Sequence, residues 1–257
     1  EIIKTIIESG KIDIHYDNDV FIRYACDVDN PNLQIIKYLT EKGAYIHVDN
    51  EEPLCTSIEK GDNNVVMFLV NSGANIHVDN ETPLRIAIES GKLDIVMYLI
   101  EKGANVHVKN DYLLTIAVRK GQYDIVTYLI DNYIKDTYKN EPNLLIEAVK
   151  SNCSEIVQYL VNSFDNVNAI NDVIKYFDRH FSLREREIYN TVLSIIYNKK
   201  VELIEKEERQ LIESWVVTVA ERPQIYFSHD SKSDDIIDDE GLRLMIRDKI
   251  MGENIHY

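Results

Sequence analysis

Four histidines recur along the first half of the sequence at nearly constant spacing. His15, His47, His77 and His107 are separated by 32, 30 and 30 residues. Imidazole is a common zinc ligand, and the ligands of one zinc ion lie about 2 Å from it. Layers of packed helices lie about 8–10 Å apart, so equivalent residues in successive layers cannot share one ion. We therefore interpret the histidines as a repeated connector residue and predict no metal site.

The cysteines also have catalytic potential by type. Cys26, Cys55 and Cys153 are widely separated and fall within helical patterns. An odd number of scattered cysteines argues against a disulfide framework and favours a reducing compartment. Cysteines in apolar helices are more typical of a core than of a nucleophile. The sequence shows no P-loop, dinucleotide-binding, zinc-protease or nucleophile-elbow motif. We therefore predict a protein that is not an enzyme and has no cofactor.

One phrase sets the period of the chain. It reads GAYIHVDN at Gly43, GANIHVDN at Gly73 and GANVHVKN at Gly103, so the period is 30 residues. A fixed period of this length is typical of stacked repeats, in which no unit can bury its apolar face alone.

Each unit contains two helical patterns. In the unit that begins at Gly73, Thr82 can cap a first helix and Pro83 suits its first turn. Gly91 ends that helix, and the apolar residues from Leu93 to Ile100 follow with the spacing of a second helix. The unit is predicted to be helix, tight turn, helix and extended connector, with first helices starting near Leu54, Leu84 and Leu114.

These residues resemble the ankyrin repeat. The motif is carried by TPL at Thr82–Leu84, the turn glycine Gly91 and GAN at Gly103–Asn105, and the same skeleton recurs along residues 1–164. The copies begin near Phe21, Pro53, Leu84, Leu114 and Pro142, with the second helix of an earlier copy at Ile2–Gly10. The resemblance implies an all-α ankyrin-repeat solenoid that binds other proteins.

The departures from the family pattern are specific. The usual ankyrin period is about 33 residues, and the missing residues fall where the family has a projecting β-hairpin. We therefore expect short connectors and a shallow groove. Cys55, Arg85 and Thr115 replace the family's TPLH histidine, whose hydrogen bond braces neighbouring repeats in that family. The short IH-containing repeats resemble the ankyrin proteins of giant amoebal DNA viruses, with effectors of intracellular bacteria as the alternative source.

Composition restricts the partners. The 257-residue chain has a formal net charge of −16, which argues against a generic nucleic-acid binder and against an anionic membrane surface. No apolar run approaches the roughly 18 residues of a membrane span. We predict protein partners, viral or host, and a cytoplasmic location (host cytoplasm for a viral protein). Because Glu1 already lies in a helical pattern, we expect the natural chain to start earlier.

The period fails after Asn162, so residues 165–257 are predicted to form a C-terminal helical domain. A capping box of Ser182 and Glu185 and a stop at Pro223 delimit parts of it. The expected helices cover 171–181, 188–196, 201–220 and 241–251. The last repeat has an apolar outer side, so the helices between 171 and 220 should pack directly on it.

Residues 228–240 are strongly acidic, and their composition predicts disorder unless their own domain or a partner orders them. The pairs Asp234–Asp235 and Asp238–Asp239 lack the glycine and terminal glutamate of an EF-hand loop. We interpret them as solvated surface. Trp215, in the helix before this segment, is either a core residue or an interface anchor.

Candidate binding residues follow from the family resemblance, because the ankyrin family varies the ends of its first helices and its connector tips to contact partners. The helix ends are Glu59, Lys60, Glu89, Ser90, Arg119, Lys120, Lys150 and Ser151. The connector tips are Asp49, Asn50, Asp79, Asn80, Lys109, Asn110, Lys139 and Asn140. The charge changes from acidic to basic along the stack, either as ordinary surface variation or as a graded groove that orients a partner. Arg119, Lys120 and Lys150 form its basic stripe.

The leading hypothesis is a non-enzymatic adaptor or scaffold in a viral or pathogen protein complex. One alternative is a substrate adaptor for a ubiquitin ligase, similar in outline to poxvirus ankyrin proteins, although no F-box pattern follows Asn162. The other alternative is an enzyme with a cryptic C-terminal domain.

Overall fold

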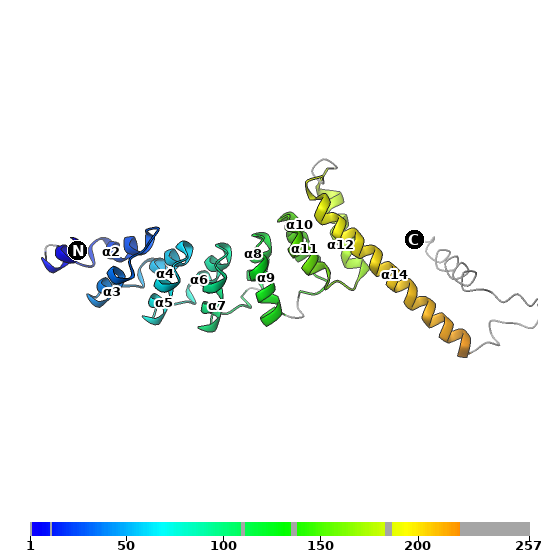
Figure 1. Cartoon of the computed structure of the whole chain (residues 1–257), viewed down its shortest axis with the longest axis horizontal. Helices are drawn as coiled ribbons and strands as arrows, with labels where there is room; N and C mark the ends of the chain where they lie inside the picture. The colour runs from blue at the N-terminus through cyan, green and yellow to red at the C-terminus, as the bar shows by residue number, and fades with distance from the viewer. Residues whose placement is uncertain (1, 11, 109–110, 135–137, 183–186, 222–257) are drawn as a thin grey trace, which may run out of the picture.

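The computed structural model describes residues 2–10, 12–108, 111–134, 138–182 and 187–221. Paired helices stand in a row along the chain, and a long helix follows them (Figure 1). Within these ranges all regular secondary structure is helical, without any strand. The prediction of an all-α repeat solenoid is confirmed.

The helices of the repeats form two layers. A short helix, α1 (Ile2–Glu8), precedes the first complete pair. The first layer consists of α2 (Tyr16–Asp27), α4 (Val48–Lys60), α6 (Val78–Glu89), α8 (Tyr112–Arg119) and α10 (Pro142–Lys150). The second layer consists of α3 (Leu33–Glu41), α5 (Asn63–Asn71), α7 (Leu93–Glu101), α9 (Tyr123–Leu129) and α11 (Ser154–Val161). Each helix contacts its neighbour in its own layer and the other helix of its pair.

Equivalent apolar positions build the core between the layers. Leu54, Leu84 and Leu114 of the first layer are at most 2 % exposed. The second layer contributes adjacent pairs of branched residues that are also at most 2 % exposed, at positions 65–66, 95–96 and 125–126. A single helix pair could not cover these side chains, which is why the repeats stabilise one another.

The connectors differ from the prediction of an extended chain. Asp79, Asn80 and Glu81 have φ values of 47°, 56° and 67° and form a left-handed turn. Asp49, Asn50 and Glu51 repeat it with φ values of 46°, 55° and 65°. Asp and Asn tolerate this region better than most residues, because their short polar side chains bond locally. This turn stands where the family has a hairpin, and the right-handed part of each helix begins two residues before Leu54 and Leu84.

The predicted cap at Thr82 was wrong in its chemistry. The hydroxyl of Thr82 donates to the carbonyl oxygen of Asp79 at 3.2 Å and caps no backbone N–H group of α6. The repeat glycines at the helix ends have positive φ values. Gly73 has a φ of 101°, which is outside the left-handed region open to other residues.

Two further helices close the C-terminal end of the stack. Helix α12 (Val167–His180) packs on α10, and α14 (Asn190–Glu221) packs on α11 and α12. A short 3₁₀ helix, η2 (Glu187–Tyr189), leads into α14. At the junction with the last repeat, α9 continues into a π-helical segment, η1 (Ile130–Ile134).

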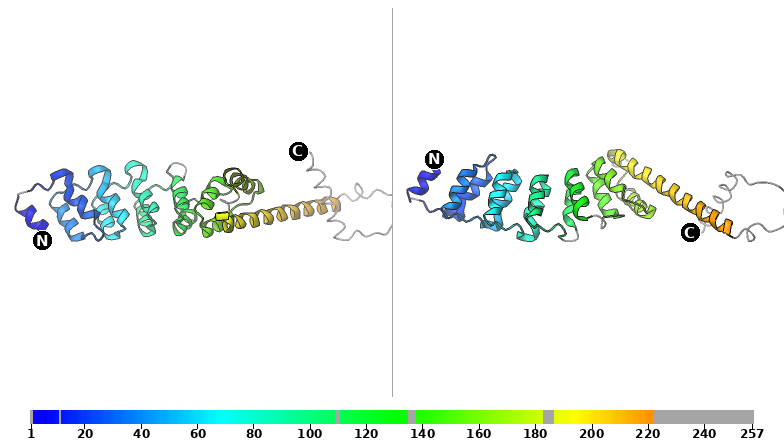
Figure 2. Two further views of the ribbon diagram at one scale, coloured as in Figure 1. Left: turned by 90° about the horizontal axis from the view of Figure 1, so that it is seen from above. Right: turned by 60° about the horizontal axis from the view of Figure 1, so that its bottom comes forward.

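The prediction of two helices over 188–196 and 201–220 was wrong. A single helix of 32 residues, α14, covers both, and Figures 1 and 2 show it running past the end of the stack. No glycine or proline interrupts this stretch, so the polar residues between the two apolar patterns do not break the backbone hydrogen bonds.

Several predictions lie outside the described residues. They concern the capping box at Glu185, the acidic segment 228–240 and the helix over 241–251. Trp215 lies on α14, but its side chain is outside the part described. None of the helices in the described ranges is both long and apolar enough to cross a bilayer.

Candidate protein-binding surface

Ion pairs between repeats connect the first-layer helices. Arg23 of α2 pairs with Glu52 of α4. Lys60 at the end of α4 lies 3.4 Å from both Asp27 and Asp29 of the preceding repeat. These two aspartates neutralise the charge of Lys60. The cation at the acidic end of the predicted charge gradient is therefore already paired within the protein. Glu59, one residue earlier, is exposed.

At the basic end, one carboxylate joins two of the three predicted cations. Glu147 Oε2 accepts from Arg119 Nε at 3.0 Å, and Glu147 Oε1 accepts from Lys150 Nζ at 3.0 Å. Burial acts to raise the pKa of Glu147, but the hydrogen bonds from Lys150 and Arg119 outweigh it and hold the pKa below its ordinary value. The sequence gives no sign of this carboxylate bridge, because Glu147 is 28 residues from Arg119.

Lys150 has a second role at the C-terminal cap. Its Nζ lies 5.0 Å from the ring centroid of Tyr176 on α12. The hydrogen bond with Tyr176 is the main cause that raises the pKa of Lys150, and Glu147 adds to it. The cation therefore stabilises the contact between α10 and α12 as well as facing the predicted binding surface. Together, Arg119, Lys120, Lys150 and Glu147 carry a formal charge of 3 − 1 = +2.

The remaining predicted residues are placed as follows. Glu89 forms a 3.0 Å ion pair with Arg85 on its own helix, and Ser90 is the C-cap of α6. Asp79 and Asn80 lie exposed in the left-handed turn. Lys109 and Asn110 are outside the described residues, as is the side chain of Trp215. The connector tips thus lie at the start of the first-layer helices and the candidate helix ends at their other end, while Trp215 is on α14.

Exposed aromatic residues in the first layer, among them Tyr24 and Tyr112, were missed by the sequence reasoning. Tyr24 of α2 is 68 % exposed and Tyr112 of α8 is 41 % exposed. Aromatic residues are enriched at the centres of protein interfaces. The sequence distinguishes them, because each tyrosine occupies a first-helix position that is polar or aliphatic in the other repeats.

The recurring histidines hold the connectors in place. In each of four repeats the Nδ1 atom lies within 3.0 Å of a carboxylate oxygen four residues later, in His15–Asp19, His47–Glu51, His77–Glu81 and His107–Asp111. We call these pairs the connector clasps. The acidic side chains of the first three are at most 8 % exposed, and the fourth is 21 % exposed. The His-x-x-x-acid spacing was visible in the sequence but had not been linked to the histidine row.

The cysteines are not arranged for nucleophilic chemistry. Burial raises the pKa of Cys26 and of Cys55 to about 11, so both thiols are protonated at neutral pH. All three cysteines are free. Cys153 was predicted to lie within a helix, but it precedes α11 as the N-cap residue. In the described residues no group of three or more histidine, cysteine or acidic side chains could hold a metal ion.

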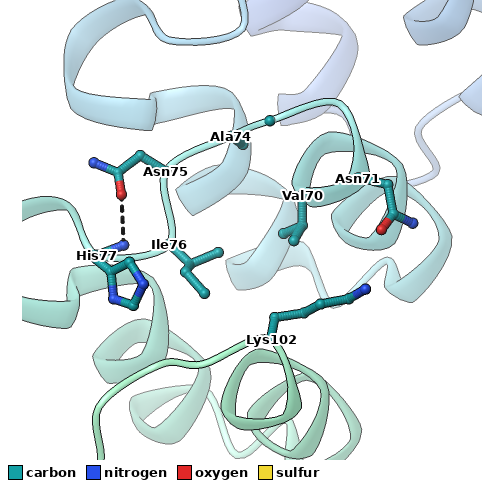
Figure 3. Close-up of a pocket in the computed structure, with 8 residues that line it drawn as sticks. Val70, Asn71, Ala74, Asn75, Ile76, His77 and Lys102 are labelled. Carbon is teal, nitrogen blue, oxygen red and sulfur yellow. Dashed lines mark hydrogen bonds between the residues drawn. The ribbon is translucent and has the colours of Figure 1, made fainter.

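An open groove of about 550 Å³ lies beside one clasp, between α5 and α7. Figure 3 shows Val70 and Ile76 on its apolar side, with Asn71, Lys102 and the ring of His77 around it. The backbone N–H of His77 donates to Asn75 Oδ1 at 2.9 Å, which fixes the turn that forms one wall (Figure 3). The groove holds one cation and apolar contacts, without the convergent acid and base of a catalytic site.

The fold defines this protein as a helical repeat solenoid, and the family comparison identifies the repeat. The family model for ankyrin repeats (3 copies) matches residues 22–110 and 106–171. The chain therefore belongs to the ankyrin-repeat family. A search of curated proteins finds no match to the sequence. Ankyrin repeats are protein-interaction modules, and proteins built from them are generally not enzymes.

Proposed function

We propose that this protein is a non-enzymatic adaptor that binds a protein target along the ends of its first-layer helices. The observation that carries the proposal is the order of charges at equivalent helix ends: Glu59 and Glu89 are followed by Arg119 and Lys150. A target with the opposite order of charges would bind in one orientation, because the reversed orientation brings like charges together.

The exposed aromatic residues of the same layer supply apolar contact area. Tyr24 lies on α2, the helix before this row of charges, and Tyr112 lies on α8, the helix that carries Arg119. Charged contacts mainly set orientation and association rate, whereas buried aromatic residues contribute more of the affinity. The combination supports one extended target rather than a short peptide bound to a single repeat.

The source and location remain part of the proposal. The repeats resemble those of giant amoebal virus proteins, which supports a role in a viral complex in the host cytoplasm. Within this proposal the basic stripe, Arg119, Lys120 and Lys150, contacts acidic side chains of the target. Arg119 and Lys150 both pair with Glu147, so Lys120 is the cation of the stripe with the fewest interactions within the protein.

The test compares two triple variants in a quantitative pull-down from host-cell lysate. One reverses the basic stripe with Arg119→Glu, Lys120→Glu and Lys150→Glu. The control makes the same charge change at Lys37, Lys42 and Lys102, whose ammonium groups lie over aromatic rings of the second layer. We expect the stripe variant to lose its captured proteins and the control to retain them.

Circular dichroism must first show that both variants are folded, because reversing Arg119 and Lys150 leaves Glu147 among like charges. Lys120→Glu alone is the milder check and should slow association measurably at low salt. Equal capture by both triple variants would place the target elsewhere on the protein. Co-purification of ubiquitin-ligase subunits would favour the substrate-adaptor alternative, and a catalytic turnover retained by residues 165–257 would favour the enzyme alternative.

A further inference from the structure

Helix α14 has two apolar faces, and only one of them is covered in the described part of the chain. Val192, Ile196 and Leu203 are at most 3 % exposed where α14 packs on α11 and α12. Figures 1 and 2 show that the C-terminal half of α14 extends away from the repeats.

The second face carries large apolar side chains that remain exposed. Tyr197 is 45 %, Val201 55 %, Ile204 37 % and Leu211 50 % exposed. Together with Glu208, these residues follow the alternating spacing of four and three that defines the seam of a coiled coil. We call positions 197, 201, 204, 208 and 211 the α14 seam. It runs for about 21 Å along the helix at 1.5 Å per residue.

Acidic residues border the α14 seam. Glu205 and Glu207 lie on its two sides, and Glu208 lies within it; all three are exposed. The flanking Lys200 is half-buried near the N-terminal end of the seam. A carboxylate inside an apolar seam favours a partner that offers a cation at that level, because an unpaired charge is costly to bury.

The charges discriminate between possible occupants. A second copy of the chain packed in parallel would bring Glu208 against its own equivalent. A second copy packed antiparallel would bring the acidic flanks, Glu205 and Glu207, against the acidic flanks of the other copy. An anionic membrane surface attracts amphipathic helices with basic, not acidic, flanks. A basic amphipathic helix satisfies both the apolar positions and the carboxylates.

We infer that the α14 seam docks an amphipathic helix of a partner protein, with basic residues on its flanks and one cation facing Glu208. This surface is on α14, on a different element from the first-layer helix ends, so it would let the protein hold two partners at once. The inference does not depend on the target proposed for the first-layer helices, since the α14 seam shares no residue with that surface.

The probe is a designed peptide of about 21 residues, with leucine at the seam positions, lysine on both flanks and one lysine in the central seam position. A second peptide carries glutamate in place of every lysine. Fluorescence anisotropy with the full chain, at about 0.15 M salt, should show that the lysine peptide binds at least about tenfold more tightly than the glutamate peptide.

Variants of the exposed face separate docking on the α14 seam from general attraction to an acidic protein. Val201→Ser with Leu211→Ser should weaken the lysine peptide at least about tenfold, while Lys206→Ser, on the opposite side of α14, should leave it unchanged. Glu208→Lys should reduce the preference for the lysine peptide. Because these side chains are exposed, circular dichroism should show the same helix content in all variants.

Three results would overturn the inference. The first is absence of binding by the lysine peptide. The second is equal binding to wild type and to the Val201→Ser, Leu211→Ser variant, which would show attraction to charge alone. The third is a dimer in light scattering that this double variant converts to a monomer, which would assign the α14 seam to a second copy of the chain.

Discussion

The Nδ1 atom of His77 lies 2.7 Å from Oε1 of Glu81, four residues further along the chain. Asp79, Asn80 and Glu81 form a left-handed turn after His77. This turn brings the Glu81 side chain back toward the imidazole. Glu81 is 6 % exposed, and its other oxygen, Oε2, has no hydrogen-bond partner. The imidazole is thus the side-chain partner of a buried carboxylate at the point where one repeat passes into the next.

Removing this imidazole should destabilise the stack. His77→Ala leaves Glu81 buried without its partner, and an unsatisfied buried polar group costs about 1–3 kcal/mol. The free energy of unfolding, measured by urea denaturation, should fall by that amount. His107→Ala is the matched control, because its partner Asp111 is 21 % exposed and can be hydrated by solvent. A loss that is as large for His107→Ala as for His77→Ala would contradict a role for burial.

The carboxylate bridge of Glu147 should make stability depend on acidity. The pKa of Glu147 in the folded protein is below its ordinary value of 4.5. Its contribution is therefore present above the unfolded pKa and is lost as the pH falls through the folded pKa. Glu147→Gln should lower the melting temperature at neutral pH, and the difference from wild type should shrink below about pH 4. Glu213→Gln, on an exposed residue of α14, controls for the charge change; an unchanged difference at low pH would refute the linkage.

The thiols should react slowly with iodoacetamide in the folded protein. Burial raises the pKa of Cys55 to about 11, and the thiolate is the reactive form. Its alkylation rate, followed by peptide mass spectrometry, should rise about tenfold per pH unit up to that value. Cys26 has the same pKa but is 0 % exposed, so it should react only after unfolding. Rapid modification of Cys26 under native conditions would show that the first repeats open.

A chain that ends at Asn162 should aggregate. Val157, Leu160 and Val161 of α11 are at most 1 % exposed in the capped protein, and α14 packs on this helix. Removal of the following helices would expose their apolar surface at the end of the stack, where repeat proteins require a polar cap. Light scattering of the truncated chain tests this. A monomeric fragment with the helix content of intact repeats would show that the cap is dispensable.

Much of the fold could be predicted because the determinants are local and repeated. The apolar residues at Leu54, Leu84 and Leu114 recur with one period, and their burial follows from that pattern. The ankyrin family itself follows from the same short motifs. The candidate helix ends were also predictable, because repeated turn glycines mark the end of each first helix.

Other features could not be read from the pattern. Backbone hydrogen bonds continue α14 through a polar stretch. The apolar periodicity does not show whether such a stretch is helical. The pairing of Arg119 and Lys150 through Glu147 depends on side chains from two helices, whose approach is set by packing. The connector clasps had a spacing signal, but their importance lies in the burial of the acidic residues, which only the stacked repeats produce.

The sequence by itself therefore determined the architecture, because helix propensity, turn glycines and apolar period act within one repeat and its neighbours. Tertiary structure decided which charges remain available on the surface. It placed Lys60 between two aspartates and used Glu147 to join Arg119 to Lys150. It also covered one face of α14 and left Val201, Ile204 and Leu211 exposed. The physical reason is that ion pairs and burial depend on distances between segments far apart in the chain, which the order of residues alone does not fix.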